Sequence, residues 1–344
     1  MNLGSKTIAD LVAERNAQKL LFTAGPASLL PENLTGLRPC FGRGDEDYAS
    51  TEDAVLEALK RFSGHARIAR MQGSASLALE ITATNFLFGN VLIVATGYYS
   101  ERLLGMAEST ARRAGEIKRV STVDWTDMDT VSGVFDWVWA CPTETSRGLK
   151  IPIAELSGLA HRLKAKLALD ATASIGLEPG HELADVIAYS SCKGLFGLTG
   201  GCFVAFNDPP RHEPDSFYLS LTTHLEKRMT GPYHTIASLA HVLPRHEEIR
   251  SSVIINKARF TRRMADWLTL PPKNQPLLCT HVRGSLQAAD KRAVLYFPRG
   301  NQNGSVVCHL GEAHLGREAK GAILDTLRYN EEKPAAPAPK DGLS

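Results

Sequence analysis

Short apolar runs alternate with amphipathic segments through the middle of the chain. The runs are "VLIVAT", "WVWACP", "KLALD" and "DVIAYS", at residues 91–96, 137–142, 166–170 and 185–190. Each run is too short for a helix and too apolar for a half-exposed strand, so each predicts a strand that is buried on both faces. The intervening "SERLLGMAESTARRAG" and "IAELSGLAHRLKA" predict helices. The pattern therefore indicates βαβ units and an α/β fold with a mostly parallel sheet between helices.

This pattern loosens beyond about residue 245. The segments "RAVLYFPRG" and "SVVCHL", followed by a last helix over "REAKGAILDTLRYN" (317–330), predict a small α+β C-terminal domain over residues 246–331. A large domain over 21–245 precedes it, after an N-terminal helical segment over 1–20. The Pro/Ala-rich end, 332–344, predicts a disordered tail.

Composition limits the classes of partner. The 344 residues include 39 Lys and Arg and 37 Asp and Glu, with both signs interspersed, which argues against nucleic acid or a membrane surface and favours small molecules. The six cysteines lack the paired spacing of zinc sites, so we expect free thiols and no bound metal. The charged N-terminus has no apolar core of signal-peptide length, and no apolar stretch is long enough to span a bilayer. These features predict a cytoplasmic protein.

Candidate chemistry lies at the strand ends, where parallel sheets bind their ligands. Those ends read "TGYYSER", "TETSRG", "DATAS" and "SSCKG". Lys193 stands on the last of these turns, between two apolar runs. Burial there would lower the pKa of its amine and make it a nucleophile toward a carbonyl group. The alternative is a loop lysine whose head reaches solvent.

Three further elements point to one ligand. Gly73–Ser76 precede an apolar helix, where free amide groups suit a phosphate, although a plain N-cap is an alternative. Asp170 ends an apolar strand, where a carboxylate needs a positively charged nitrogen unless it caps the next segment. Tyr98 or Tyr99 could lie flat against an aromatic ligand or fill the core. Together with Lys193, these elements predict pyridoxal 5'-phosphate (PLP), which needs an amine, an acid and a phosphate cradle.

A known family carries these elements in the same order. The segments "FTAGPA", "GSASLALE", "TGYYSER", "ETSRG", "DATASIG", "SSCKGLFGLTGG" and "TGPYHT" resemble the landmarks of the class V aminotransferases of PLP fold type I. The nearest branch holds the alanine:glyoxylate and 2-aminoethylphosphonate:pyruvate aminotransferases. The resemblance covers about residues 20–245. It implies a large PLP-binding domain, a small and shortened C-terminal domain, and a homodimer with shared active sites.

The resemblance also implies roles for individual residues. Lys193 would form an imine with PLP and then move the substrate proton, while Asp170 would keep the ring nitrogen protonated. Tyr99 would stack on the ring, and Ser146 would bind the phenolic oxygen of the cofactor. The residues implied at the phosphate are Ser74, Ala75, Ser76 and, from the neighbouring subunit, Thr230.

The sequence departs from the family pattern where substrate should bind. His309 stands in the place of the arginine that binds the substrate carboxylate, and a neutral imidazole cannot make that bidentate contact. Arg147 stands where relatives carry a small hydroxyl residue. We hypothesise that Arg147, together with Arg43, binds an anionic substrate group such as a carboxylate, phosphonate or phosphate; a surface salt bridge is the alternative. Cys192 takes the place of a side chain that often reaches the phosphate, which predicts modest cofactor affinity.

The resulting hypothesis is an aminotransferase that acts on a small anionic amine and a 2-oxo acid or aldehyde. A PLP-dependent lyase or desulfurase of the same fold is one alternative, for which Cys279 and Cys308 are poor nucleophile candidates. A homologue that has lost transamination and serves as a binding or regulatory protein is another. A dinucleotide-binding oxidoreductase would need a glycine-rich fingerprint that "VLIVATGYYSER" does not provide.

Overall fold

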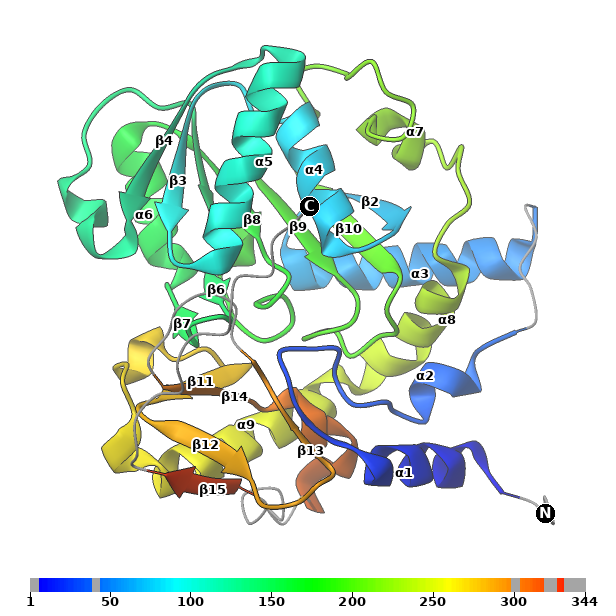
Figure 1. Cartoon of the computed structure of the whole chain (residues 1–344). Helices are drawn as coiled ribbons and strands as arrows, with labels where there is room; N and C mark the ends of the chain where they lie inside the picture. The colour runs from blue at the N-terminus through cyan, green and yellow to red at the C-terminus, as the bar shows by residue number, and fades with distance from the viewer. Residues whose placement is uncertain (1–5, 39–43, 298–303, 319–326, 331–344) are drawn as a thin grey trace, which may run out of the picture.

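A seven-stranded sheet forms the centre of the larger part of the molecule (Figure 1). The computed structural model describes residues 6–38, 44–297, 304–318 and 327–330. The order across the sheet is β2-β10-β9-β8-β5-β3-β4, and only β10 runs antiparallel to its neighbours. The strands are β2 (Arg67–Gln72), β3 (Gly89–Ala95), β4 (Ile117–Asp124), β5 (Trp137–Ala140), β8 (Lys166–Asp170), β9 (Val186–Ser190) and β10 (Gly201–Phe206). The predicted α/β fold with a mostly parallel sheet is confirmed.

Helices cover both faces of this sheet because its strands are apolar on both sides. Along β3, Leu92 and Val94 belong to one buried cluster, and Val91 and Ile93 belong to the other. The first cluster includes side chains of α3 (Glu46–Ser63), α6 (Ile153–Leu163) and α8 (Tyr233–Val242). The second includes side chains of α4 (Ala75–Asn85), α5 (Tyr98–Ala114) and α7 (Leu221–Leu225). The four short apolar runs of the sequence are thus β3, β5, β8 and β9, as predicted.

The strand directions bring distant segments to one edge. The carboxyl ends of β2, β3, β5, β8 and β9 meet there with the amino end of β10. The short hairpin of β6 (Thr143–Glu144) and β7 (Leu149–Lys150) follows β5 at the same edge. The candidate segments between residues 73 and 201 therefore all lie at this edge of the sheet.

The C-terminal part contains several small two-stranded sheets beside a long helix (Figure 1). Its elements are α9 (His246–Arg263), β11 (Cys279–Val282), β12 (Ser285–Ala288), β13 (Ala293–Leu295), β14 (Ser305–Cys308) and β15 (Leu327–Asn330). After α1 (Ile8–Gln18), strand β1 (Leu20–Phe22) pairs in parallel with β13, so the start of the chain joins this part. The proposed domain boundaries at residues 20, 245 and 331 stay predictions, and the predicted tail lies outside the described residues.

The predicted helix over residues 317–330 is wrong in the part that the structure describes. Residues Leu310–Glu318 form a 3₁₀ helix, and Leu327–Asn330 form β15, which pairs antiparallel with β12. Pairing with an otherwise open strand satisfies backbone groups that a short helix end would leave to solvent. The tertiary partner therefore decides the conformation of this segment.

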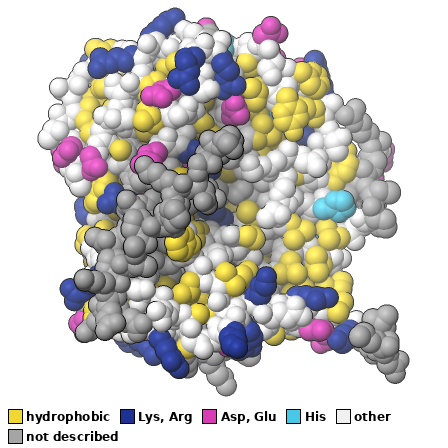
Figure 2. Space-filling view, viewed as in Figure 1, with side chains coloured by type: hydrophobic (Ala, Val, Ile, Leu, Met, Phe, Trp, Pro, Cys, Tyr) yellow, Lys and Arg dark blue, Asp and Glu magenta, His cyan; other side chains and the backbone are white. Residues whose placement is uncertain are grey.

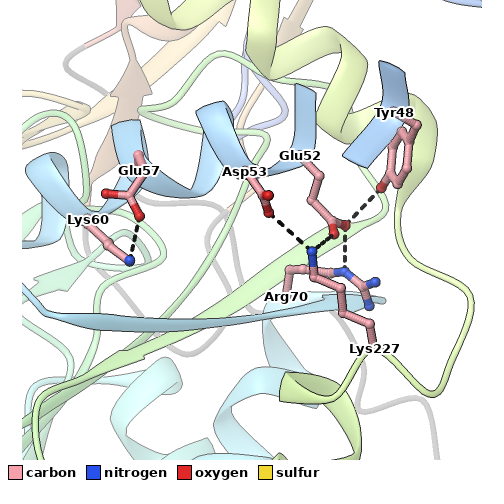
Figure 3. Close-up of polar contacts among 7 residues, drawn as sticks. All are labelled: Tyr48, Glu52, Asp53, Glu57, Lys60, Arg70 and Lys227. Carbon is pink, nitrogen blue, oxygen red and sulfur yellow. Dashed lines mark hydrogen bonds and ion pairs between the residues drawn. The ribbon is translucent and has the colours of Figure 1, made fainter. Parts of the chain in front are cut away.

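A buried ionic cluster ties α3 to the edge strand β2 (Figure 3). Glu52 Oε1 accepts from Arg70 Nε at 2.7 Å, and both side chains are nearly inaccessible. The ammonium group of Lys227, from the loop after α7, lies 2.6 Å from Glu52 Oε2 and 3.2 Å from Asp53. The Tyr48 hydroxyl donates to Glu52 Oε1 at 2.9 Å. The cluster joins α3 and β2, which are neighbours in the sequence, to the loop after α7, which lies far from both in the chain.

Charged side chains of both signs are interspersed on the face that Figure 2 shows, as the composition predicts. The five cysteines in the described part are free, again as predicted. None of the described helices is both long and apolar enough to cross a membrane.

Candidate active site

A cavity of about 390 Å³ lies at the carboxyl edge of the sheet. Its lining includes six of the residues predicted from the sequence: Ser74, Ala75, Ser76, Tyr99, Asp170 and Lys193. They come from α4, α5, the end of β8 and the turn after β9. The topology thus brings together the residues that the strand-end argument selected.

Lys193 enters the cavity between an aromatic ring and a glycine turn. Its Nζ atom lies 5.7 Å from the centre of the Tyr99 ring. A Cβ atom added to Gly25, whose φ is +136°, would lie only 2.9 Å from Lys193 Cγ. A side chain at residue 25 would therefore displace the lysine, and glycine also suits the backbone conformation there.

Asp170 is a buried carboxylate, 5% exposed, at the end of β8. Its Oδ1 atom accepts a hydrogen bond from the backbone of Thr172 at 3.0 Å. Among the described residues no lysine or arginine forms an ion pair with it. A buried carboxylate is costly without a positive partner, and a protonated ring nitrogen in the cavity would provide one.

The start of α4 offers a phosphate cradle. Ser74 is the N-cap, but its side chain makes no capping hydrogen bond, and the first turn contains no acidic residue. Arg102, which the sequence analysis did not select, lines the same cavity and donates through Nη2 to Ser76 Oγ at 3.0 Å. One feature of the sequence could have identified Arg102. It lies three residues after Tyr99 on α5 and therefore on the same face of that helix.

The loop after β5 differs in detail from the expectation. The Ser146 hydroxyl donates to Glu144 Oε1 at 2.5 Å, and Ser146 is not among the residues that line the cavity. Its neighbour Thr145 does line it. Glu144 is fully buried and also accepts from the Tyr99 backbone at 2.9 Å, so it joins this loop to the start of α5. The role of Ser146 toward the phenolic oxygen stays a prediction, with Thr145 as an additional candidate.

Several buried polar atoms around the cavity lack partners among the described residues. They are the hydroxyls of Thr143 and Thr172, and the Nε atom of Arg102. Such atoms are usually hydrogen-bonded in folded proteins. A ligand with a phosphate, a phenolic oxygen and a ring nitrogen would supply partners for them and for Asp170. The residues present therefore fit PLP.

Three other predicted residues, which the structure describes, do not line the cavity. Arg147 is exposed and donates through Nη1 to the backbone oxygen of Thr96, at the end of β3, at 3.3 Å. Thr230 is exposed on the loop after α7. His309 is buried in the C-terminal part. Arg43 lies outside the described residues.

His309 packs against α9 and is not among the residues that line the cavity. Its Nε2 atom lies 2.9 Å from the hydroxyl of Thr280, and its ring centre lies 5.3 Å from that of Phe260. Burial, together with the charge of Lys257, lowers the pKa of His309 to about 3. The imidazole is therefore neutral at ordinary pH, and a contact of His309 with substrate, in the place of the family's arginine, stays a prediction.

Comparison with curated proteins finds distant relatives among aminotransferases. No family model matches the chain. An uncharacterised aminotransferase of Helicobacter pylori is 24% identical over 231 residues, which are 64% of this chain and 59% of that protein. A 2-aminoethylphosphonate–pyruvate transaminase of Pseudomonas aeruginosa is 24% identical over 253 residues, 67% of this chain and 68% of the relative. The chain thus spans about three fifths of the length of the first relative and about two thirds of the second.

Solved structures match over most of the chain. An aspartate aminotransferase of Thermus thermophilus has a TM-score of 0.77 at 21% identity, covering 89% of this chain and 97% of its own. An alanine–glyoxylate aminotransferase of Nostoc sp. has a TM-score of 0.74 at 18% identity, covering 90% and 93%. The chain therefore has the type I fold of the PLP-dependent aminotransferases, and its resemblance to their class V branch is confirmed.

Proposed function

We propose that the protein is a PLP-dependent aminotransferase that exchanges an amino group between a small anionic amine and a 2-oxo acid or aldehyde. The observation that carries this proposal is the convergence of Lys193, Asp170, Tyr99 and the start of α4 on one cavity. The names of the relatives support the reaction class, since they include a 2-aminoethylphosphonate–pyruvate transaminase.

Each residue then has a chemical task. PLP, when bound, supplies an electron sink next to the carbon that exchanges its amino group. Lys193 would hold the cofactor through Nζ and, once displaced by the amine substrate, move the proton from the substrate carbon to C4' of the cofactor. Asp170 would keep the ring nitrogen protonated, because the buried carboxylate favours a positive partner. Tyr99 would pack against the ring and fix its plane.

The substrate class rests on the cations around the site. We propose that Arg147 binds the anionic group of the amine, with Arg43 as a second candidate. In support, Arg147 follows Ser146 in the loop after β5 and reaches the backbone of Thr96, close to the start of the helix that carries Tyr99. His309 is buried and neutral at ordinary pH, so it cannot balance a carboxylate or phosphonate charge.

We also propose a homodimer with shared active sites. Thr230 is exposed and lies outside the cavity of its own chain as described. Large apolar side chains near this loop are also exposed, namely Phe217, Tyr218 and Leu225. A partner subunit would cover them and could bring its own Thr230 to the phosphate. A cytoplasmic location stays a prediction.

The direct test is covalent trapping at Lys193. The protein is incubated with PLP, reduced with borohydride and digested, and the peptides are mapped by mass spectrometry. We expect the cofactor mass on Lys193 and none on the K193A variant. A panel of amines, including aminoalkylphosphonates and alanine, should then shift the cofactor absorbance, with glyoxylate or pyruvate reversing the shift. An unlabelled Lys193 would refute the proposal.

Sulfide release from cysteine would distinguish a desulfurase from an aminotransferase. Cys279 and Cys308 are fully buried in paired strands, and burial raises the pKa of the Cys308 thiol. A thiolate nucleophile is therefore disfavoured at Cys308, and burial keeps both side chains from a substrate. We expect no sulfide release under conditions in which amino transfer is measurable.

A further inference from the structure

The start of α4 concentrates positive charge without a matching anion. The dipole of this 11-residue helix and the amides of its first two residues, Ala75 and Ser76, are positive toward the cavity. Ser74 does not cap these amides with its side chain, and no acidic residue lies in the first turn. The cradle thus lacks the anionic or polar partner that a helix start usually has.

Arg102 adds a full positive charge at the same place. It lines the cavity, and its Nη2 atom donates to Ser76 Oγ at 3.0 Å. Its Nε atom is buried and has no hydrogen-bond partner, and the guanidinium group forms no ion pair within the described residues. Arg113, on the same helix, behaves differently, because its Nη2 atom lies 2.9 Å from Glu80 Oε1.

Another polar group that lines this cavity also lacks a hydrogen-bond partner. The side chain of Thr143 is 1% exposed, lines the cavity and has an unpaired hydroxyl. The guanidinium of Arg102 lies 5.5 Å from the centre of the Tyr99 ring, which restricts its orientation. A ligand that presents a dianion to α4 and an aromatic ring to Tyr99 would satisfy all these groups.

We propose that Arg102 is a direct ligand of the PLP phosphate; this inference rests on the proposed function. The guanidinium supplies charged donors, while Ser76, which accepts from Arg102, keeps its own hydroxyl hydrogen for the phosphate. Cys192 also lines the cavity, but a thiol is a weak donor. Arg102 therefore supplies the strong side-chain contact that the thiol cannot make.

The test compares PLP with pyridoxal, which has the same ring and aldehyde but no phosphate. Both are titrated into the full-length apoprotein, and binding is followed by the absorbance of the lysine adduct. We expect R102M to raise the Kd for PLP by roughly ten- to a hundredfold, the value of a charge-assisted hydrogen bond, and to leave the Kd for pyridoxal nearly unchanged. R102K keeps the positive charge but loses the planar pair of guanidinium donors. Its Kd for PLP should therefore lie between those of R102M and the wild type.

R113M is the matched control, because it removes an arginine of the same helix that is already paired with Glu80. It should leave both Kd values unchanged. Equal weakening of PLP and pyridoxal by R102M, or an unchanged Kd for PLP in both Arg102 variants, would overturn the inference while leaving the proposed function in place. If the wild-type protein binds neither compound, the proposed function and this inference fall together.

Discussion

His309 illustrates how burial decides what a single titratable side chain can do. It is 6% exposed, and the lowering of its pKa to about 3 arises first from burial and then from the charge of Lys257. In the unfolded chain the same imidazole would titrate at an ordinary pKa of about 6.5. Between these two pH values the unfolded chain binds a proton that the folded chain does not bind.

The expected consequence is a loss of stability in mild acid. Because the pKa of His309 is lower in the folded state, its contribution is complete above about pH 6.5 and decreases as the pH falls toward 3. Between pH 6.5 and 5 the loss is roughly 2 kcal/mol. Urea unfolding of the wild type and H309Q at pH 7 and pH 5 measures this difference. H161Q, at an exposed histidine, is the control. An equal acid loss in the wild type and H309Q would contradict the expectation.

The residue scale also shows how far the sequence predicts the site. Residues at strand ends, such as Lys193, Asp170 and Tyr99, could be selected because parallel strands share one edge. The same argument could not decide whether Ser146 or Thr145 lines the cavity. The direction of a side chain after a strand depends on the turn and, for Ser146, on its partner Glu144. Arg102 was missed because a charged residue on a helix usually faces solvent.

At the scale of elements, the central strands of the sheet were predictable, and the last segment was not. The apolar runs that became β3, β5, β8 and β9 are buried on both faces, so their composition alone identifies them. Residues 327–330 carry a helix-like pattern but pair with β12. Their conformation depends on a partner strand about 40 residues earlier in the chain, which local periodicity does not record.

The Glu52 cluster makes a testable prediction about elements. Burial alone would raise the pKa of Glu52, but hydrogen bonds from Lys227 and Arg70 and the charge of Arg70 lower it, so the carboxylate is ionised. E52Q would leave Arg70, whose side chain is 5% exposed, without its counter-charge. Removing one partner of a buried pair costs about 3–5 kcal/mol, so we expect a loss of this size in the free energy of unfolding in urea.

Helix α3 also carries the control residue for the E52Q measurement. Glu57 pairs with Lys60 at 2.5 Å, but the side chain of Glu57 is 61% exposed (Figure 3). E57Q should change the free energy of unfolding by less than about 0.5 kcal/mol, because water screens an exposed pair. Similar losses in E52Q and E57Q would mean that the cluster does not hold α3, β2 and the loop after α7 together.

At the scale of the whole molecule, the C-terminal part differs most from expectation and contributes least to the cavity. Its residues are absent from the described lining, which comes from residues 73 to 201. The cation that should bind substrate is therefore not supplied by β14, where His309 follows the strand and packs against α9. Arg147 and Arg43 therefore stay the proposed ligands of the substrate anion.

A homodimer with shared sites predicts complementation between two defective variants. K193A should abolish cofactor attachment, and T230A should weaken PLP binding in the partner's site. In a mixed dimer one site carries both substitutions, and the other carries neither. If the subunits are co-expressed in equal amounts, half of the dimers are mixed, so about a quarter of all sites should be intact.

The measurement is borohydride labelling of Lys193 at a PLP concentration that labels the wild type but neither variant. Sedimentation analysis of the wild type should show a dimer at the same protein concentration. Labelling of about a quarter of the wild-type amount after co-expression, and none after mixing under conditions that prevent subunit exchange, fits shared sites. A monomer in sedimentation would show that each chain builds its site alone, and a T230A variant that labels like the wild type at limiting PLP would show that Thr230 contributes nothing across an interface.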